Sequence, residues 1–305
     1  MSGSTAATDT GRPAVPPPRP VRWGEAGLTA LLLAFLVAWT LHPLLPELAD
    51  NLLGDADTDA IRGMWGLDHL RRSILPPDTP VWSKQVNFPY GVLALVLPWT
   101  SGVILAPIGM LFGPVVGYNL GVAAILWAGA MSTAWLVRTT SGSWAAGAML
   151  GAGMISQPML LHAVADGTPE HVALWGIPAF LAATHEAVRR KNTAWGLVAG
   201  VLAIAVTLDS PYHAIYTALL GALVLPVALW THWESSRRSD MLMTLGALLL
   251  TAAVGAGLVA GLFRNFPLEE TVGLDGDALR SMNAADLHTW WQFDFGPAGE
   301  RDPSL

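Results

Sequence analysis

Residues 117–137, GYNLGVAAILWAGAMSTAWLV, form a continuous apolar stretch without a single charged side chain. A helix needs about 20 mostly apolar residues to cross the hydrocarbon core of a bilayer. Arg138 follows the stretch directly, and basic residues flanking a span are typical of one side of a membrane. The stretch therefore predicts a transmembrane helix that ends in a basic turn.

Other apolar stretches of similar length lie on both sides of this one. The predicted spans are residues 24–42, 117–137, 143–162, 171–188, 194–208, 212–231 and 241–263. Backbone polar groups inside a bilayer must find their partners within the chain, which favours helices. We therefore expect an all-α integral membrane protein, a bundle of about seven transmembrane helices.

The composition agrees with a membrane protein and excludes several classes of site. Hydrophobic residues make up 52% of the 305 residues and charged residues only 13%, about half the charged share of a soluble protein. The lack of cysteine excludes a disulfide framework, a thiol nucleophile and a cysteine-bound metal. The formal net charge of −7 gives no basic footprint for nucleic acid, so we expect membrane lipids and no nucleic acid as partners.

The apolar segment 92–112 is ambiguous because prolines and glycines interrupt it. In short loops, Lys and Arg stay on the cytoplasmic side of the membrane. If 92–112 does not cross, the basic N-terminal tail and the basic turns at Arg138, 189–191 and 237–238 all lie on one side. We therefore expect 92–112 to be re-entrant or interfacial, and the N-terminus to be cytoplasmic.

This topology divides the chain into three parts. Residues 1–22, rich in Ser, Thr and Pro, are expected to form a disordered cytoplasmic tail. Residues 23–263 are expected to form the transmembrane module, in which 43–116 is a long first outer loop. Residues 264–305 are expected to be an outer segment, the start of a further C-terminal part.

The first outer loop holds the densest polar chemistry of the chain. Asp55, Asp57 and Asp59 lie within five residues of one another, just before an amphipathic segment that predicts a surface helix from about 59 to 74. Two interpretations stay open: a solvated loop that caps this helix, or an acidic catalytic or metal-binding cluster above the bilayer. The positive end of the helix would also attract a phosphate.

Several short motifs follow one another in order along the spans. They are GDADTDAIRGMW at 54–65, NFPYG at 87–91, GYNLGV at 117–122, a basic turn at 138–143, DGTPEH at 166–171 and LDSPYH at 208–213. Their order and spacing resemble bacterial multi-pass members of the GT-C fold, the membrane glycosyltransferases that use lipid-phosphate sugars. The resemblance covers roughly residues 24–235 and implies a GT-C-like bundle in the bacterial inner membrane.

The resemblance also implies transfer of a sugar from a polyprenyl-phosphate donor to an acceptor on the outer face of the membrane. Similar proteins, such as protein O-mannosyltransferases and aminoarabinose transferases, keep an acidic residue in the first outer loop as general base or to position the acceptor. The matching candidates are Asp57 and Asp59, with Asp55 next. A divalent metal ion at this acidic cluster is a candidate cofactor, and its ligands are unknown.

Basic residues of the same loop are candidates for holding the donor phosphate: Arg62, Arg71, Arg72 and Lys84. Arg71 and Arg72 have a second interpretation, as the end of the surface helix in contact with lipid headgroups. Two further outer clusters are substrate-binding candidates: Asp166, Glu170 and His171 in one, and Asp209 and His213 in the other. For the cluster that begins at Asp166, an interfacial turn is an equal alternative.

A non-catalytic multi-pass membrane protein is the alternative function, either a transporter half or an assembly partner that keeps the fold. Transporters tend to place ionisable residues in the middle of broken helices. Here the ionisable residues lie at the ends of the predicted spans. Their placement favours a surface-facing site over a transport path.

Overall fold

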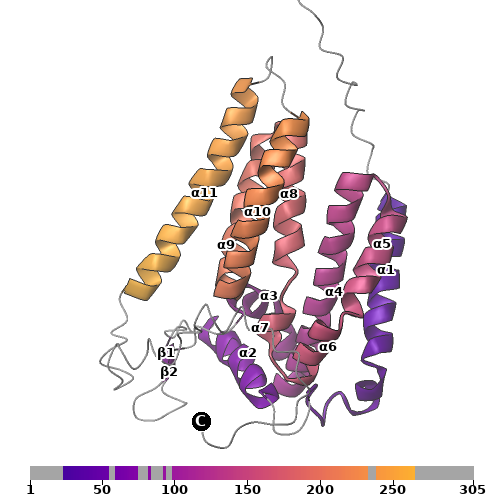
Figure 1. The fold of residues 1–305 in the computed structure, drawn as a ribbon. Coiled ribbons are helices and arrows are strands. Elements are labelled where there is room, and N and C mark those ends of the chain that lie inside the picture. Colours follow the sequence, from indigo (N-terminus) through magenta and orange to yellow (C-terminus); the bar gives the residue numbers. More distant parts are fainter. Residues whose placement is uncertain are drawn as a thin grey trace, which may run out of the picture.

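The computed structural model describes residues 23–54, 59–74, 82–83, 92–93, 98–232 and 238–264. This part of the chain is helical apart from two strands of two residues each, which pair antiparallel (Figure 1). The expected all-α architecture is therefore confirmed for the residues that the structure describes.

From α3 to α10 the helices follow one another with short connections. In chain order, the elements are α1 (Trp23–Thr40), the 3-10 helix η1 (His42–Glu47), α2 (Ala60–Ile74), β1 (Trp82–Ser83), β2 (Val92–Leu93), α3 (Trp99–Phe112), α4 (Pro114–Ser141), α5 (Trp144–Ile155), α6 (Pro158–Ala165), α7 (Pro169–Val172), α8 (Gly176–Arg190), α9 (Thr193–Asp209), α10 (Pro211–His232) and α11 (Arg238–Arg264). The predicted surface helix at 59–74 is therefore present as α2.

Four of the described helices, α1, α4, α10 and α11, are long and apolar enough to cross a membrane. Helices α5 and α6 make a fifth candidate if the pair, bent by 46°, is one span. Helices α8 and α9 have only 15 and 17 residues, because the predicted span 171–188 is broken before Gly176 and Pro211 begins a new helix directly after α9. The described part of the chain thus has four or five candidate spans, which is compatible with an α-helical membrane protein, and the count of seven stays a prediction.

Helix α4 is the centre of one half of the bundle, where it packs against α1, α3, α5 and α8. Its residues Leu126, Ala130 and Ala134 are completely buried. Helix α5 approaches them closely because it places glycines at the contact. A Cβ atom at Gly147 would lie 2.5 Å from the carbonyl oxygen of Ala134, and one at Gly151 would lie 2.7 Å from that of Ala130. Small residues at helix contacts are typical of membrane proteins.

The other half of the bundle consists of α8, α9, α10 and α11. Glycines again allow a close contact between helices. A Cβ atom at Gly196 of α9 would lie 2.5 Å from the carbonyl oxygen of Thr244 in α11. The outward faces of α10 and α11 carry large apolar side chains, such as Leu223 and Leu250, which are 69% and 66% exposed. Such faces are typical of helices that contact lipid rather than water.

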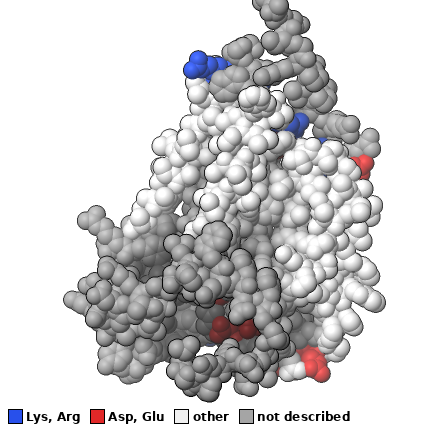
Figure 2. Space-filling view, in the orientation of Figure 1, with Lys and Arg blue, Asp and Glu red and all other residues white. Residues whose placement is uncertain are grey.

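Several basic residues gather at one end of the bundle and several acidic residues at the other, although Glu25, Glu186 and Asp240 lie at the basic end and Arg72 at the acidic end. The basic end comprises the α4–α5 turn, the α8–α9 turn and the start of α11, with Arg138, Arg189, Arg190, Lys191 and Arg238. The acidic end comprises η1, α2, the α6–α7 turn and the α9–α10 turn, with Glu47, Asp50, Asp59, Asp166 and Asp209. Figure 2 shows blue atoms toward the top of the bundle and red atoms mainly toward the bottom. The gathering of basic turns is the pattern from which the topology is predicted, and the sidedness stays a prediction.

Helix α3 packs beside the first turns of α4, where a Cβ atom at Gly121 would lie 3.5 Å from the Leu105 side chain. Its first turn contacts the end of α9, since Ser101 binds Asp209. Its last turn contacts the start of α4, where a Cβ atom at Gly117 would lie 2.5 Å from the Cα atom of Gly109. Whether 92–112 crosses the membrane stays a prediction.

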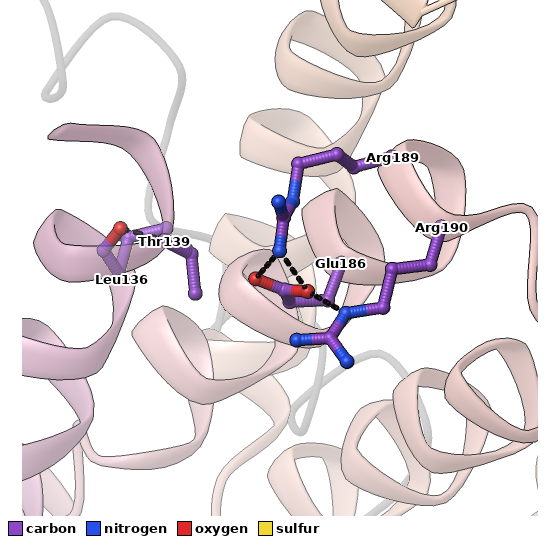
Figure 3. Close-up of polar contacts among 5 residues, drawn as sticks. All are labelled: Leu136, Thr139, Glu186, Arg189 and Arg190. Atoms are coloured by element: carbon purple, nitrogen blue, oxygen red, sulfur yellow. Dashed lines mark hydrogen bonds and ion pairs between the residues drawn. The ribbon is translucent and has the colours of Figure 1, made fainter. Parts of the chain in front are cut away.

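The basic end contains one buried carboxylate that is neutralised within its own helix (Figure 3). Glu186 of α8 is 2% exposed. Arg189 donates to both of its carboxylate oxygens, at 2.8 and 2.7 Å, and Arg190 donates to it through Nε. A buried charge is tolerated when it is paired and hydrogen-bonded in this way. Arg189 and Arg190 are therefore already engaged at the end of α8.

Candidate functional site

The start of α2 and the turn between α6 and α7 meet at the acidic end. The backbone N–H of Asp59 donates a hydrogen bond to the carbonyl oxygen of Asp166, at 3.0 Å. The two chains approach closely because each has a glycine at the contact. A Cβ atom at Gly63 would lie 2.8 Å from the carbonyl oxygen of Gly167, and one at Gly167 would clash with the backbone of Ala60. The first predicted acidic cluster and the second are therefore joined.

The α6–α7 turn holds its shape through backbone hydrogen bonds. Gly167 has a φ of +70°, a conformation that glycine adopts readily. Glu170 follows in α7 and is buried, whereas His171 is exposed. The turn thus presents His171 at the surface and keeps the Glu170 side chain inside. Both interpretations of this cluster, an interfacial turn and a substrate site, agree with that arrangement.

Asp209, the last residue of α9, is buried and bound on both carboxylate oxygens. The Ser101 backbone N–H donates to Oδ1 at 2.8 Å, and the Ser101 hydroxyl donates to Oδ2 at 2.7 Å. The indole N–H of Trp175 donates to Oδ2 at 3.0 Å and also lies 2.9 Å from the Ser101 hydroxyl. Asp209 therefore ties α3 to α9 and to the segment before α8.

Burial dominates the electrostatics of Asp209, which lies one residue beyond the predicted span 194–208. It raises the pKa of the Asp209 carboxyl to about 6, although the hydrogen bonds from Ser101 and Trp175 favour the charged form and oppose the rise. With its oxygens occupied by protein donors, Asp209 is suited to holding the acidic end together.

His213 lies one turn into the next helix, α10. It is buried, and its Nδ1 atom has no hydrogen-bond partner among the described residues. His171 of the α6–α7 turn is near enough to interact with it electrostatically. The structure therefore brings the second and third predicted clusters together through two histidines. The buried ring of His213 retains capacity for one more hydrogen bond.

Several predicted site residues lie outside the described structure or are already paired. Asp55, Asp57 and Lys84 are not among the described residues, and Arg62 and Arg71 are placed only as positions in α2. Arg72 pairs with Asp68 one turn earlier, at 2.6 Å, and its side chain is 60% exposed. This pair fits the second interpretation of Arg72, as part of the end of the surface helix.

Asn119 is a positioning residue that sequence reasoning missed. It is 1% exposed in α4. Its Oδ1 atom accepts a hydrogen bond from the Leu53 N–H at 2.8 Å, and its Nδ2 atom donates to the carbonyl oxygens of Leu48 and Asn51 at 2.9 and 2.8 Å. Asn119 therefore fixes the chain directly before the Asp55–Asp59 segment. Its signal was an isolated amide in an otherwise apolar span.

Among the residues described, no group of three or more His, Asp or Glu side chains is arranged to hold a metal ion. The candidate metal site at Asp55 and Asp57 lies outside those residues. Asp59 is the one member of that cluster whose position is described, and it is exposed. An exposed carboxylate beside a rigid turn is able to contact a substrate.

Comparison with family models, with curated proteins and with solved structures found no match to this chain.

Proposed function

We propose that this protein is a membrane glycosyltransferase that transfers a sugar from a polyprenyl-phosphate donor to an acceptor at the acidic end of the bundle. The observation that carries the proposal is the contact between Asp59 and Asp166, which joins two of the three acidic clusters. A single site must gather base, cation and acceptor contacts within reach of one substrate. The resemblance of the ordered motifs to the GT-C fold supports the same function.

The proposed chemistry needs a base for the acceptor hydroxyl. The base removes the proton as the hydroxyl oxygen forms a bond to the sugar C1, and the bond from C1 to the phosphate oxygen breaks. Asp57 or Asp59 takes this role, with Asp55 next. Asp59 is exposed, and it contacts Asp166 through its backbone N–H. The Asp209 carboxylate is buried and bound by Ser101 and Trp175.

The leaving phosphate needs positive charge. Arg62 and Arg71 of α2 belong to the helix that begins beside Asp59, and guanidinium groups match phosphate geometry. The N-terminus of α2, a helix of 15 residues, adds partial positive charge on the same side. A prenyl chain would lie in the adjacent bilayer. A divalent metal ion at Asp55 and Asp57 would stabilise the same phosphate.

The proposal includes a bundle of about seven crossings in the bacterial inner membrane, with the N-terminus in the cytoplasm. Helices of 15 and 17 residues, α8 and α9, would extend over about 22 and 26 Å, somewhat less than the hydrocarbon core of about 30 Å. Both short helices pack beside longer helices, and these longer helices would cross the full thickness of the core. The gathering of basic residues at one end supports this sidedness.

A non-catalytic multi-pass protein is the second candidate, either a transporter half or an assembly partner. One observation favours it. At the acidic end, Asp209 and Asn119 are buried and bound to protein groups, which is what a purely structural role requires.

The experiment that separates the two functions is sugar transfer by the full chain in nanodiscs. Polyprenyl-phosphate donors with different labelled sugars are offered with a membrane extract as the acceptor source, and labelled product is counted. We expect label to leave the polyprenyl phosphate only when the protein is present. No transfer from any donor tried would favour the non-catalytic protein.

A further inference from the structure

A hollow of about 570 Å³ lies at the acidic end, between η1 and the end of α6. Its volume is within the range of small-molecule sites, about 300–1,000 Å³. The residues that line it include Glu47, Asn51 and Gly54 on one side and Leu161, Val164 and Ala165 on the other. Ala165 precedes Asp166, whose carbonyl oxygen accepts the hydrogen bond from Asp59. The hollow therefore borders the contact that joins the first two acidic clusters.

An apolar groove adjoins this hollow, because Leu41 at the end of α1 lines both. The groove has a volume of about 220 Å³ and runs between α1 and α4. Along α1 it extends from Ala34 to Leu41, which is about 10 Å of helix. Leu45 in its lining is 51% exposed, so the groove is open to its surroundings. Because α1 and α4 are candidate spans, the groove would lie beside the hydrocarbon of the leaflet at the acidic end.

Asn119 holds the segment that separates the groove from the hollow. Its Nδ2 atom donates to the carbonyl oxygens of Leu48, which lines the groove, and of Asn51, which lines the hollow. Its Oδ1 atom accepts a hydrogen bond from the Leu53 N–H. This wall is therefore fixed before a ligand arrives, and a preformed site loses less free energy on binding than one that must first be ordered.

The hollow carries negative charge at its edge. Glu47 is exposed, and its carboxylate accepts a hydrogen bond from the side-chain amide of Asn51. A carboxylate has two oxygens with about four lone pairs, so it can accept further hydrogen bonds beside this one. No Lys or Arg is among the described residues that line the hollow or the groove. The hollow therefore suits hydroxyl donors and disfavours a phosphate.

We propose that the hollow and the groove together bind the sugar acceptor, and that this acceptor is a lipid with an uncharged, hydroxylated head group. One hydrocarbon chain lies in the groove between α1 and α4, and the head group lies in the hollow with a hydroxyl that donates to Glu47. The inference rests on the proposed glycosyl transfer and names its acceptor class.

A second hydroxyl of the head group is the one that reacts. Its oxygen forms a bond to the sugar C1, its proton passes to a carboxylate of the first outer loop such as Asp59, and the bond from C1 to the phosphate oxygen breaks. The products are a glycolipid, which carries one more sugar than the acceptor, and polyprenyl phosphate. Separate subsites for a neutral acceptor and an anionic donor keep the two lipids apart.

The test is native mass spectrometry of the full-length protein in a detergent without a sugar head group. The protein is titrated with glucosyl diacylglycerol or with phosphatidylglycerol of identical acyl chains. Both head groups carry hydroxyls, and only the second carries a charge. We expect glucosyl diacylglycerol to bind about tenfold more tightly, which is the size of one hydrogen bond to a charged group.

Matched variants locate the binding. Glu47→Gln should reduce the preference between the two lipids to near equality, whereas Asp50→Asn, a neighbouring exposed carboxylate outside the lining, should keep it. Ala38→Trp fills the groove from an exposed position of α1 and should abolish tight binding of either lipid. Ala253→Trp, the same change at an exposed position of α11, should leave binding unchanged. All four positions are exposed, so normal folding is expected.

The same two lipids are then offered as sole acceptors in the transfer assay. We expect label on glucosyl diacylglycerol only, and its loss in Ala38→Trp. Equal binding of the two lipids by the parent protein, or full binding by Ala38→Trp, would overturn the proposal even if transfer to another acceptor of a membrane extract shows that the protein is a transferase. Selective binding without transfer from any donor would instead overturn the proposed function and the acceptor role with it, and would leave only a lipid site.

Discussion

Ser101 binds the carboxylate of Asp209 twice, through its backbone N–H at 2.8 Å and its hydroxyl at 2.7 Å, although the two residues are 108 positions apart. Asp209 ends α9, and Ser101 lies in the first turn of α3. A carboxylate at a helix N-terminus satisfies N–H groups that have no partner within the helix. This pair therefore ties the first turn of α3 to the end of α9.

Removing the carboxylate should destabilise the protein strongly. Asp209→Ala leaves the Ser101 N–H and the Ser101 hydroxyl buried without the acceptor that they share, at about 1–3 kcal/mol for each. We expect the melting temperature in detergent to fall by at least about 5 °C. Ser101→Ala removes one hydroxyl and should cost less. Glu47→Ala, an exposed acid at the same end, is the control, and an equal loss in that variant would contradict the role of Asp209.

The same carboxyl predicts a dependence of stability on pH. Its pKa is raised to about 6 in the folded protein, so the folded state binds a proton more readily than the unfolded state does. Stability from this group therefore increases as the pH falls through about 6. The melting temperature of the parent minus that of Asp209→Asn should rise between pH 7.5 and pH 5. A difference in melting temperature that falls on acidification, or that does not change, would contradict the raised pKa of Asp209.

The long helices α1, α4, α10 and α11 could be predicted from apolar length alone, and they lie close to the predicted ranges. Helix α2 was also predictable, because its apolar residues recur at helical spacing. The break before Gly176 was not. Periodicity does not reveal that Pro169–Val172 form a short helix of their own, α7, because tertiary contacts decide that local break.

The hydrogen-bond partners within the site could not be predicted from the sequence, for a similar reason. Asp209 was singled out as an acid at the end of an apolar run, yet its partner Ser101 is in a segment interrupted by prolines and glycines. Such long-range pairs depend on where α3 packs in the bundle. Asn119 lies in the motif GYNLGV at 117–122, but a motif does not show which backbone groups a side-chain amide will bind.

Glycine contacts between α4 and α5 predict a stability effect with an internal control. Gly147→Ala places a Cβ atom 2.5 Å from a backbone oxygen of α4, so the helices must separate. We expect a loss of melting temperature of several degrees. Gly153→Ala, in the same helix with open space around it, should be neutral or slightly stabilising because alanine favours helix. Equal effects of the two substitutions would show that the close contact carries no stability.

Sidedness can be measured directly because the chain has no cysteine. We expect a single cysteine at Thr193, exposed at the basic end, to react with a membrane-impermeant maleimide only from the cytoplasmic side. A single cysteine at Glu47, exposed at the acidic end, should react only from the opposite side. Reaction of both cysteines from the same side would show that 92–112 crosses the membrane. The acidic clusters of the proposed site would then not all lie on one face of the membrane.

The acidic cluster should matter for turnover and not for folding. Asp59→Asn removes the negative charge and keeps the backbone N–H that donates to Asp166, so the contact between α2 and the α6–α7 turn survives. At an exposed position such a change usually alters stability by less than about 0.5 kcal/mol. Loss of a general base typically costs about 10²–10⁴ in rate. Asp57→Asn tests the other candidate base in the same way, and the assay is sugar transfer in nanodiscs with the melting temperature measured alongside.

The matched control for these two variants is Asp50→Asn, an exposed carboxylate at the same end that lies outside the cluster. It changes the local charge equally, so a general electrostatic effect on donor binding would appear in all three variants at similar size. A general base would instead appear as a loss of nearly all transfer in Asp59→Asn or Asp57→Asn alone. If both of these transfer sugar like the parent while the parent is active, Asp55 or the Asp166 cluster becomes the candidate base. If all three lose activity in parallel, the acidic end attracts the acceptor or a metal ion, and no single carboxylate of the first loop is the base.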